Sequence, residues 1–100
     1  MIIGGVEFDE AELADFCQRH GVARLSVFGS ILRDDFGPDS DVDMLVEFLP
    51  GRTPGIVGFG QMILELSDMV GRQVDLRTPY DLSRYFRASA LANARTLHAA

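Results

Sequence analysis

Two aspartates, Asp41 and Asp43, stand at the front of an apolar run in the segment DVDMLVEFL, residues 41–49. If this run is a β-strand, positions i and i+2 place both side chains on one face, with their Cα atoms about 6.5 Å apart. Two ionised carboxylates at that separation repel each other by about 2.5 kcal/mol at an effective dielectric near 20. A divalent cation removes this cost, because Mg²⁺ takes one or two carboxylates and fills its other positions with water and phosphate oxygens. Alternatively, both carboxylates could simply be solvated at the start of the strand. The two residues by themselves do not decide between a cation site and two solvated side chains.

A Gly-Ser pair, Gly29-Ser30, ends the preceding apolar segment VARLSVFGS, residues 22–30. Backbone N–H groups and a serine hydroxyl at the start of a helical turn can cradle a phosphate. A glycine there lets the phosphate approach because no Cβ is in the way. The dipeptide by itself equally fits an ordinary turn.

A third carboxylate, Asp75, lies inside the short apolar segment RQVDLRT, residues 72–78. A lone carboxylate in an apolar strand is costly to bury, so it should have a partner. If this strand lies beside residues 41–49, Asp75 joins the face that carries Asp41 and Asp43. Three carboxylates can hold two metal ions, the arrangement that clamps the attacking and leaving oxygens in phosphoryl or nucleotidyl transfer. Asp75 can also accept the proton of an attacking hydroxyl.

The elements that must position these residues follow from hydrophobic periodicity and from capping signals. Asp9 is expected to cap the first helix and Gly21 to end it. The Gly/Pro-rich stretch 50–60 predicts a mobile loop, although Pro54 allows the following helix to begin early. The order predicts a small α/β layer, with a mostly buried sheet backed by helices. The expected helices span 9–20, 61–71 and 79–100, and the expected strands span 22–30, 41–49 and 72–78.

Length and composition limit what the chain can do. One hundred residues predict a single domain, 1–100, with one core and one shallow site, so a partner is expected to complete any substrate site. The net charge of −6 and the lack of a basic stripe disfavour direct nucleic-acid binding. The single cysteine, Cys17, excludes an internal disulfide and is expected in the core. With no signal-peptide pattern and no membrane-length apolar run, the expected location is the cytoplasm, with no membrane partner.

The spacing of these residues resembles a known pattern. Gly29-Ser30, ten intervening residues and Asp41-Val42-Asp43 form the G-S-x10-D-x-D signature of the DNA polymerase β-like nucleotidyltransferase superfamily. Within it, the chain resembles the minimal nucleotidyltransferases, the small MntA-like antitoxins. The resemblance extends to LRDDFGPDSDVDMLVEF, PGRTPG and VDLRTPYDLSRYF, and it covers nearly the whole chain.

The resemblance implies a fold and an activity. The implied fold is a palm-like α/β core with a small mixed sheet. The implied activity is that of the antitoxin of a type VII HEPN/MNT toxin–antitoxin system. Such a protein transfers AMP from ATP, with Mg²⁺ in a two-metal site, to a tyrosine hydroxyl of the partner HEPN toxin, a ribonuclease, and releases pyrophosphate. Homo- or hetero-oligomers are both compatible with it.

The resemblance also implies roles for the individual residues. Asp41 and Asp43 are expected to bind both metal ions, and Asp75 to bind the catalytic metal and favour deprotonation of the acceptor hydroxyl. These three residues are therefore both the catalytic set and the metal-ligand set.

The nucleotide is expected to contact a second group of residues. Gly29 and Ser30 would hold the terminal phosphates, and Arg33 would contact a phosphate. An ion pair of Arg33 with a neighbouring aspartate is an equally good alternative. Ser40 is expected to orient the loop before Asp41.

Two other functions fit the same residues. The chain could neutralise the toxin by binding alone, without catalysis, or it could modify a small molecule such as an antibiotic. The segment SRYFR, residues 83–87, pairs arginines with aromatic residues, a composition typical of interface hot spots, so it is a candidate partner contact. The acceptor, the preferred nucleotide and the oligomeric state do not follow from the sequence.

Overall fold

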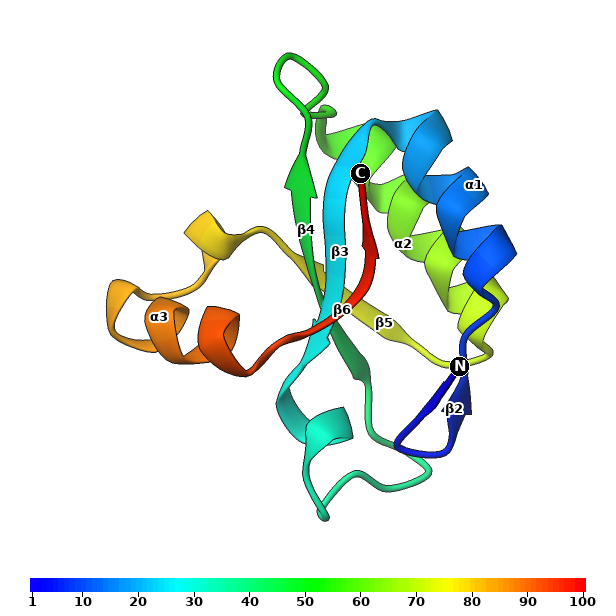
Figure 1. Cartoon of the computed structure of the whole chain (residues 1–100), viewed down its shortest axis with the longest axis vertical. Helices are drawn as coiled ribbons and strands as arrows, with labels where there is room; N and C mark the ends of the chain where they lie inside the picture. Colours follow the sequence, from blue (N-terminus) through cyan, green and yellow to red (C-terminus); the bar gives the residue numbers. More distant parts are fainter.

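The computed structural model describes all 100 residues, and at its centre is a four-stranded sheet with the strand order β5-β4-β3-β6 (Figure 1). A separate two-stranded hairpin, β1-β2, lies at the N-terminus. The elements in chain order are β1 (Ile2–Ile3), β2 (Val6–Glu7), α1 (Glu10–His20), β3 (Val22–Phe28), the 3₁₀ turn η1 (Gly29–Leu32), β4 (Val42–Phe48), α2 (Ile56–Val70), β5 (Val74–Arg77), the 3₁₀ turn η2 (Pro79–Asp81), α3 (Arg84–Asn93) and β6 (Arg95–Ala99).

The central sheet is mixed. β3 pairs antiparallel with both β4 and β6, whereas β4 pairs parallel with β5. A parallel pair needs a crossover connection, and α2 supplies it between β4 and β5. The predicted small mixed sheet backed by helices is therefore confirmed.

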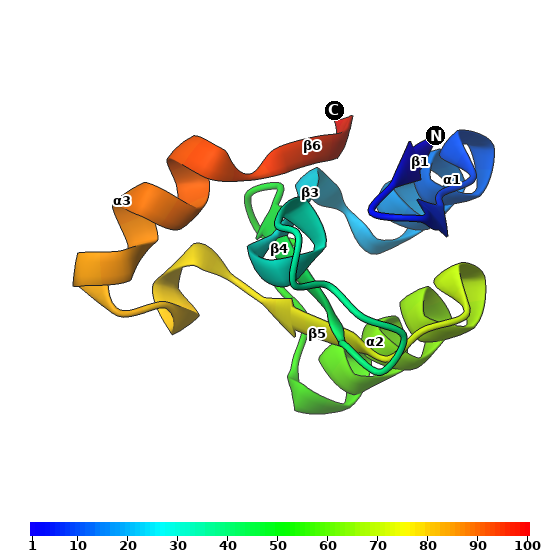
Figure 2. The same cartoon turned by 90° about the horizontal axis from the view of Figure 1, so that it is seen from below.

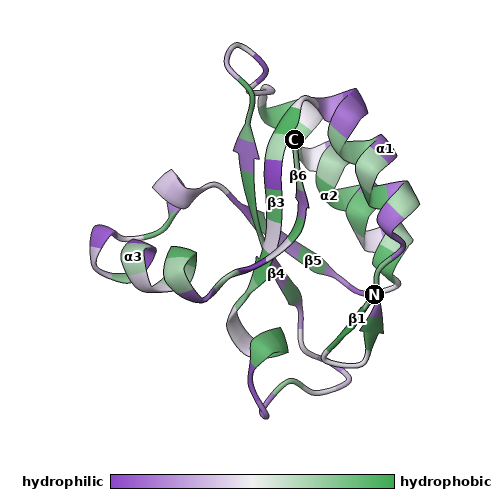
Figure 3. Ribbon diagram, in the orientation of Figure 1, coloured by the Kyte–Doolittle hydropathy of each residue, from purple (hydrophilic) through white to green (hydrophobic).

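Helices cover the two faces of the sheet unequally. Figure 2 shows α1 and α2 together on one side and α3 on the other. The main core lies under α1 and α2 and takes one set of alternating strand residues, such as Leu25, Val42 and Met44. A smaller cluster under α3 contains Phe28, Leu45, Leu82 and Ala90. Figure 3 shows apolar segments in α2 and along β4, whereas hydrophilic residues alternate with apolar ones in α1.

Helix α1 forms as its sequence predicts. The Asp9 side chain accepts a hydrogen bond from the backbone N–H of Glu12 at 3.1 Å, and Gly21 ends the helix with a φ of 67°. Cys17 is buried, and desolvation raises the pKa of its thiol to about 11.

Three expectations about the elements are wrong or incomplete. The final helix does not run over 79–100: α3 ends at Asn93, and residues 95–99 form β6, because edge pairing with β3 and burial of Leu97 override the helix propensity of this alanine-rich segment. Helix α2 begins at Ile56, so part of the expected loop is helical. The hairpin β1-β2 was not predicted, since two-residue strands carry no periodic signal.

None of the helices combines the length and the apolar character that crossing a membrane requires.

Candidate active site

The end of β3 brings the backbone of Gly29 against the carboxylate of Asp43. Gly29 has a φ of 75°, in the left-handed region that residues with a Cβ rarely adopt. A Cβ added at this position would also collide with Oδ2 of Asp43. Position 29 therefore requires glycine for two reasons, its backbone conformation and the space that the carboxylate occupies.

The pairing of β4 with β5 places Asp43 beside Asp75. The two residues are direct partners in the parallel register, and neighbouring strands lie about 4.8 Å apart. Partial burial raises the pKa of the Asp43 carboxyl, and the negative charges of Asp75 and Asp41 raise it further, against a smaller opposing effect of Arg77 and Arg33. The expectation that Asp75 shares a face with the other two aspartates depended on this strand pairing, which the structure contains.

Arg77 is the partner of Asp75, and the sequence did not single it out. Its Nε donates to Oδ1 of Asp75 at 3.2 Å, and its Nη2 donates to Oδ2 at 3.3 Å. Arg77 is two residues from Asp75 on the same strand, so both side chains share a face. That spacing is the signal that could have identified it.

An open cleft of about 460 Å³ contains these groups. Its walls come from the end of β3, from β4 and β5, and from the η2–α3 connection, and its charged lining residues are Arg33, Asp43, Asp75, Arg77 and Asp81. A second hollow of about 380 Å³ adjoins it and shares Phe28, Gly29, Arg33 and Phe86. Together they form one continuous depression along α3.

The remaining predicted residues lie around this cleft. Asp41 immediately precedes β4 and is exposed, and Ser30 follows Gly29 in the turn η1. Arg33 lines the cleft but forms an ion pair with Asp35, with Nε and Oδ1 3.1 Å apart. The alternative prediction of a local ion pair for Arg33 thus describes this structure.

Ser40 orders the turn before Asp41. Its Oγ accepts a hydrogen bond from the backbone N–H of Gly37 at 3.0 Å. Arg72 donates from Nη2 to the carbonyl oxygens of both Gly37 and Ser40. Ser40 and Arg72 therefore hold the turn that leads into β4, and the predicted role of Ser40 at the nucleotide stays a prediction.

The carboxylates offer suitable ligands for Mg²⁺, although the structure contains no group of three Asp, Glu, His or Cys side chains close enough to hold one ion. Asp75 forms an ion pair with Arg77, with Oδ1 and Nε 3.2 Å apart. The raised pKa of Asp43 nevertheless marks a carboxylate that lacks a sufficient countercharge, and carboxylate oxygens are the donors that Mg²⁺ prefers. The residues present fit a divalent cation held by Asp43 and Asp75, with Asp41 at the edge of the same face.

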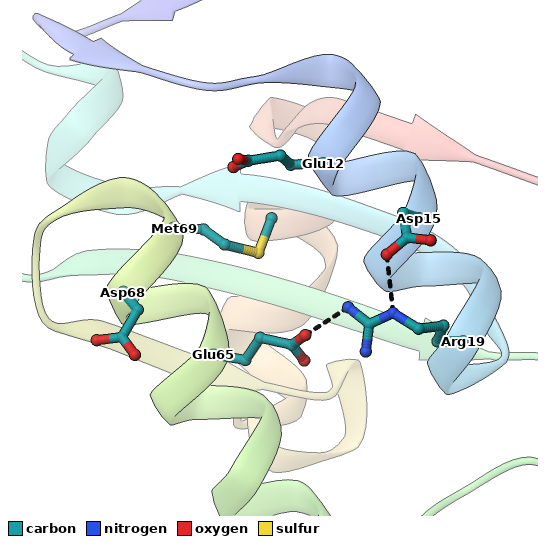
Figure 4. Close-up of a pocket in the computed structure, with 6 residues that line it drawn as sticks. All are labelled: Glu12, Asp15, Arg19, Glu65, Asp68 and Met69. Atoms are coloured by element: carbon teal, nitrogen blue, oxygen red, sulfur yellow. Dashed lines mark hydrogen bonds and ion pairs between the residues drawn. The ribbon is translucent and has the colours of Figure 1, made fainter.

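A different hollow, of about 400 Å³, lies between α1 and α2 (Figure 4). Glu12, Asp15, Arg19, Glu65, Asp68 and Met69 line it. Arg19 donates from Nε to Asp15 at 2.8 Å and from Nη2 to Glu65, so the arginine is shared between two carboxylates. This hollow lies on the opposite side of the sheet from the aspartate cleft and contains none of the residues predicted to do chemistry.

The chain belongs to the nucleotidyltransferase domain family, whose model matches residues 11–98. The protein adenylyltransferase MntA of Thermococcus cleftensis is 39% identical over 59 residues, which are 59% of this chain and 58% of that protein. The chain spans about three fifths of the length of the curated relatives it matches.

Solved structures agree with this assignment. One described as a "putative minimal nucleotidyltransferase" has a TM-score of 0.70 and 34% identity, with 85% of each chain covered. A toxin–antitoxin structure with AMP-PNP has a TM-score of 0.72 over 93% of this chain and 75% of its own, at 16% identity. A tri-AMPylated HEPN toxin of Shewanella oneidensis in complex with its MNT antitoxin gives a TM-score of 0.63 over 91% of this chain and 70% of that one, also at 16% identity. At these low identities, the last two show a shared fold. The resemblance to minimal nucleotidyltransferases is confirmed.

Proposed function

We propose that this chain is a Mg²⁺-dependent nucleotidyltransferase that transfers AMP from ATP to a tyrosine hydroxyl of a HEPN toxin and thereby acts as its antitoxin. The observation that carries the proposal is the meeting of Gly29, Asp43 and Asp75 in one cleft, at the end of the Gly-Ser turn. Relatives named as protein adenylyltransferases support the same activity.

In the proposed reaction, the acceptor oxygen bonds to the α-phosphorus of ATP, and the bond from that phosphorus to the bridging oxygen breaks to release pyrophosphate. The N–H groups of the Gly29-Ser30 turn and the Ser30 hydroxyl hold the terminal phosphates, and Arg33 and Arg77 are cations within reach of the same cleft. Asp75 favours removal of the acceptor proton. Mg²⁺, held by Asp41, Asp43 and Asp75, would supply charge neutralisation and polarise the phosphate.

The open shape of the cleft favours a protein over a small molecule as the acceptor. One wall is the sheet face and the other is the short η2–α3 connection, so nothing in this chain closes over a bound nucleotide. A partner that brings the tyrosine would also exclude water from the reacting groups.

The test incubates the full chain with α-labelled ATP, Mg²⁺ and the HEPN-domain toxin proposed as its partner. Wild type should label the HEPN protein, and the Asp41→Asn plus Asp43→Asn double variant should not. A HEPN protein without label, or with undiminished label from the double variant, contradicts the proposal.

The same variant separates catalysis from binding. If catalysis neutralises the toxin, cells that carry the toxin and the double variant should not grow. Growth of those cells would show that the chain acts by binding alone, the alternative that the sequence left open.

A further inference from the structure

Asp41 lies between two residues that are both tied to the segment 72–73, immediately before β5. Arg72 donates from Nη2 to the carbonyl oxygen of Ser40 at 2.5 Å. The backbone N–H of Val42 donates to the carbonyl oxygen of Gln73 at 2.9 Å. The backbone is therefore held on both sides of Asp41, while the Asp41 side chain itself is exposed and takes part in none of the ion pairs of the chain.

Arg72 also holds the turn that precedes Asp41 at two further points. Its Nη2 donates to the carbonyl oxygen of Gly37 at 2.7 Å, and its guanidinium lies 4.6 Å from the centre of the Phe36 ring. The turn is closed by the hydrogen bond from the Gly37 N–H to Oγ of Ser40 at 3.0 Å. Hydrogen bonds from a charged donor are stronger than those from a neutral one, and the planar guanidinium fixes their directions.

The contacts of Arg72 indicate a geometric role. Its side chain is half-buried and has no carboxylate partner, although acidic residues outnumber basic ones, 15 to 9, in the chain. Its donors go to two backbone carbonyls instead. The segment 72–75 therefore holds the chain around Asp41 and also contains Asp75, the register partner of Asp43.

We propose that Arg72 is a positioning residue for the cation site: by holding the turn 36–40, it keeps the Asp41 carboxylate where it can bind the same divalent cation as Asp43 and Asp75. Arg72 does not itself line the aspartate cleft, so it acts through the backbone on either side of the turn. This inference rests on the proposed function, because that function supplies the cation.

The positive charge of Arg72 gives the test two opposite expected signs. If the charge alone mattered, its removal would strengthen the binding of a divalent cation, because one repulsive interaction would be lost. If Arg72 positions Asp41, its removal weakens cation binding, and residues that orient metal ligands typically contribute about 10–100-fold in affinity. Arg72→Gln therefore separates the two effects by the direction of the change.

The experiment measures the Kd of Mn²⁺, used as the probe for Mg²⁺, by electron paramagnetic resonance of the free ion in the presence of the full chain. Arg72→Gln should raise this Kd about tenfold or more. An unchanged or lower Kd overturns the proposal, as does a wild-type chain that does not bind Mn²⁺.

Arg52→Gln is the matched control. Arg52 also donates from Nη2 to a backbone carbonyl, that of Arg19 at 3.1 Å, but it lies in the connection after β4, at the other end of the strand from Asp41. The substitution removes the same charge and the same kind of hydrogen bond, and its Kd for Mn²⁺ should equal that of wild type. An increase equal to that of Arg72→Gln overturns the proposal.

The same measurement with Asp41→Asn shows whether Arg72 acts through that carboxylate. Asp41→Asn alone should weaken Mn²⁺ binding, and Arg72→Gln added to it should cause no further loss, because both substitutions remove one contribution. A distorted Arg72→Gln chain would bind less Mn²⁺ in either background, so a full additional loss overturns the proposal.

Phe36→Leu is a milder variant, because it removes the ring beside the guanidinium and leaves every hydrogen-bonding group in place. It should weaken Mn²⁺ binding about threefold in the wild-type background and should have no effect when combined with Asp41→Asn. Equal losses in the two backgrounds contradict a role that is exerted through Asp41.

Failure of the proposed function gives a different result. If wild type transfers no AMP but the Kd values follow the expected pattern, the cation site and the role of Arg72 stand and the assigned reaction is wrong. If wild type transfers AMP and Arg72→Gln binds Mn²⁺ as tightly as wild type does, only the role of Arg72 is refuted.

Discussion

Glu65, between α1 and α2, and Asp43, in the cleft, are both partly buried carboxylates. The groups that act on Glu65 are cations, whereas carboxylates are prominent around Asp43. Burial alone would raise the pKa of Glu65, but hydrogen bonds from Arg19 and His20 outweigh it and lower the pKa. Burial likewise raises the pKa of Asp43, and there the neighbouring carboxylates Asp75 and Asp41 raise it further. Glu65 has its countercharges within the chain, whereas Asp43 does not have enough of them.

The ionised form of Glu65 stabilises the fold, whereas the ionised form of Asp43 destabilises it. A lowered folded-state pKa means that ionised Glu65 stabilises the protein, and this contribution is lost as the pH falls through that pKa. The raised pKa of Asp43 has the opposite sign. Its contribution is fully present below the unfolded pKa and is lost as the pH rises through the folded one. At neutral pH, Asp43 therefore costs stability, and a bound cation would offset that cost.

The largest expected effect comes from removing the uncompensated charge. Asp43→Asn should lower AMP transfer about a thousandfold or more. Because it also removes the repulsion from Asp75, it should raise the melting temperature at pH 7 without Mg²⁺. Scanning calorimetry and a labelled-ATP assay measure the two effects. A lower melting temperature for the variant would break the comparison with Glu65.

Gly29→Ala should affect the cleft next most strongly. It forces a Cβ into a left-handed backbone and against Asp43, so we expect a loss of about 1–3 kcal/mol of unfolding free energy and about a hundredfold in transfer. Gly51→Ala is the matched control, since Gly51 has the same φ of 75° but no atom within 4 Å of an added Cβ. Equal losses of stability in the two variants, measured by urea unfolding, would show that the approach to Asp43 does not matter.

Arg77→Ala should have a smaller effect, on the nucleotide. It removes the only cation paired with Asp75 and one of two arginines in the cleft, so the KM for ATP should rise about tenfold. Arg24→Ala, outside the cleft, should leave the KM unchanged. An unaltered KM for Arg77→Ala would show that Arg77 pairs with Asp75 but does not contribute to nucleotide binding.

Glu65→Gln should have the smallest effect, and only on stability. The pair with Arg19 is partly exposed, so we expect a loss of about 0.5–1 kcal/mol at pH 7 and normal AMP transfer. The difference from wild type should shrink as the pH falls below the usual glutamate pKa of about 4.3. A difference that grows in acid would contradict the assigned sign.

Local signals predicted the part of the site that lies within single elements. Spacing alone indicated Gly29-Ser30 at a strand end and Asp41 with Asp43 on one strand face. Asp75 joins them only if its strand lies beside residues 41–49. The i, i+2 spacing puts Arg77 on the same face as Asp75, but its place in the site also depends on the pairing of β5 with β4, which sets Asp75 beside Asp43.

The C-terminal segment shows where local reasoning fails. Residues 94–100 favour a helix by composition, but β3 offers an open edge and the core has space for Leu97. Such a preference is set by partners far away in sequence, so propensity alone gives the wrong element.

The η2–α3 connection leaves the sheet from one edge strand, β5, and returns to it at the opposite edge strand, β6. Because both ends of this connection are tied to strands of one sheet, an insertion or deletion in α3 would alter the path between β5 and β6 and, with it, the side of the aspartate cleft that Phe86 lines.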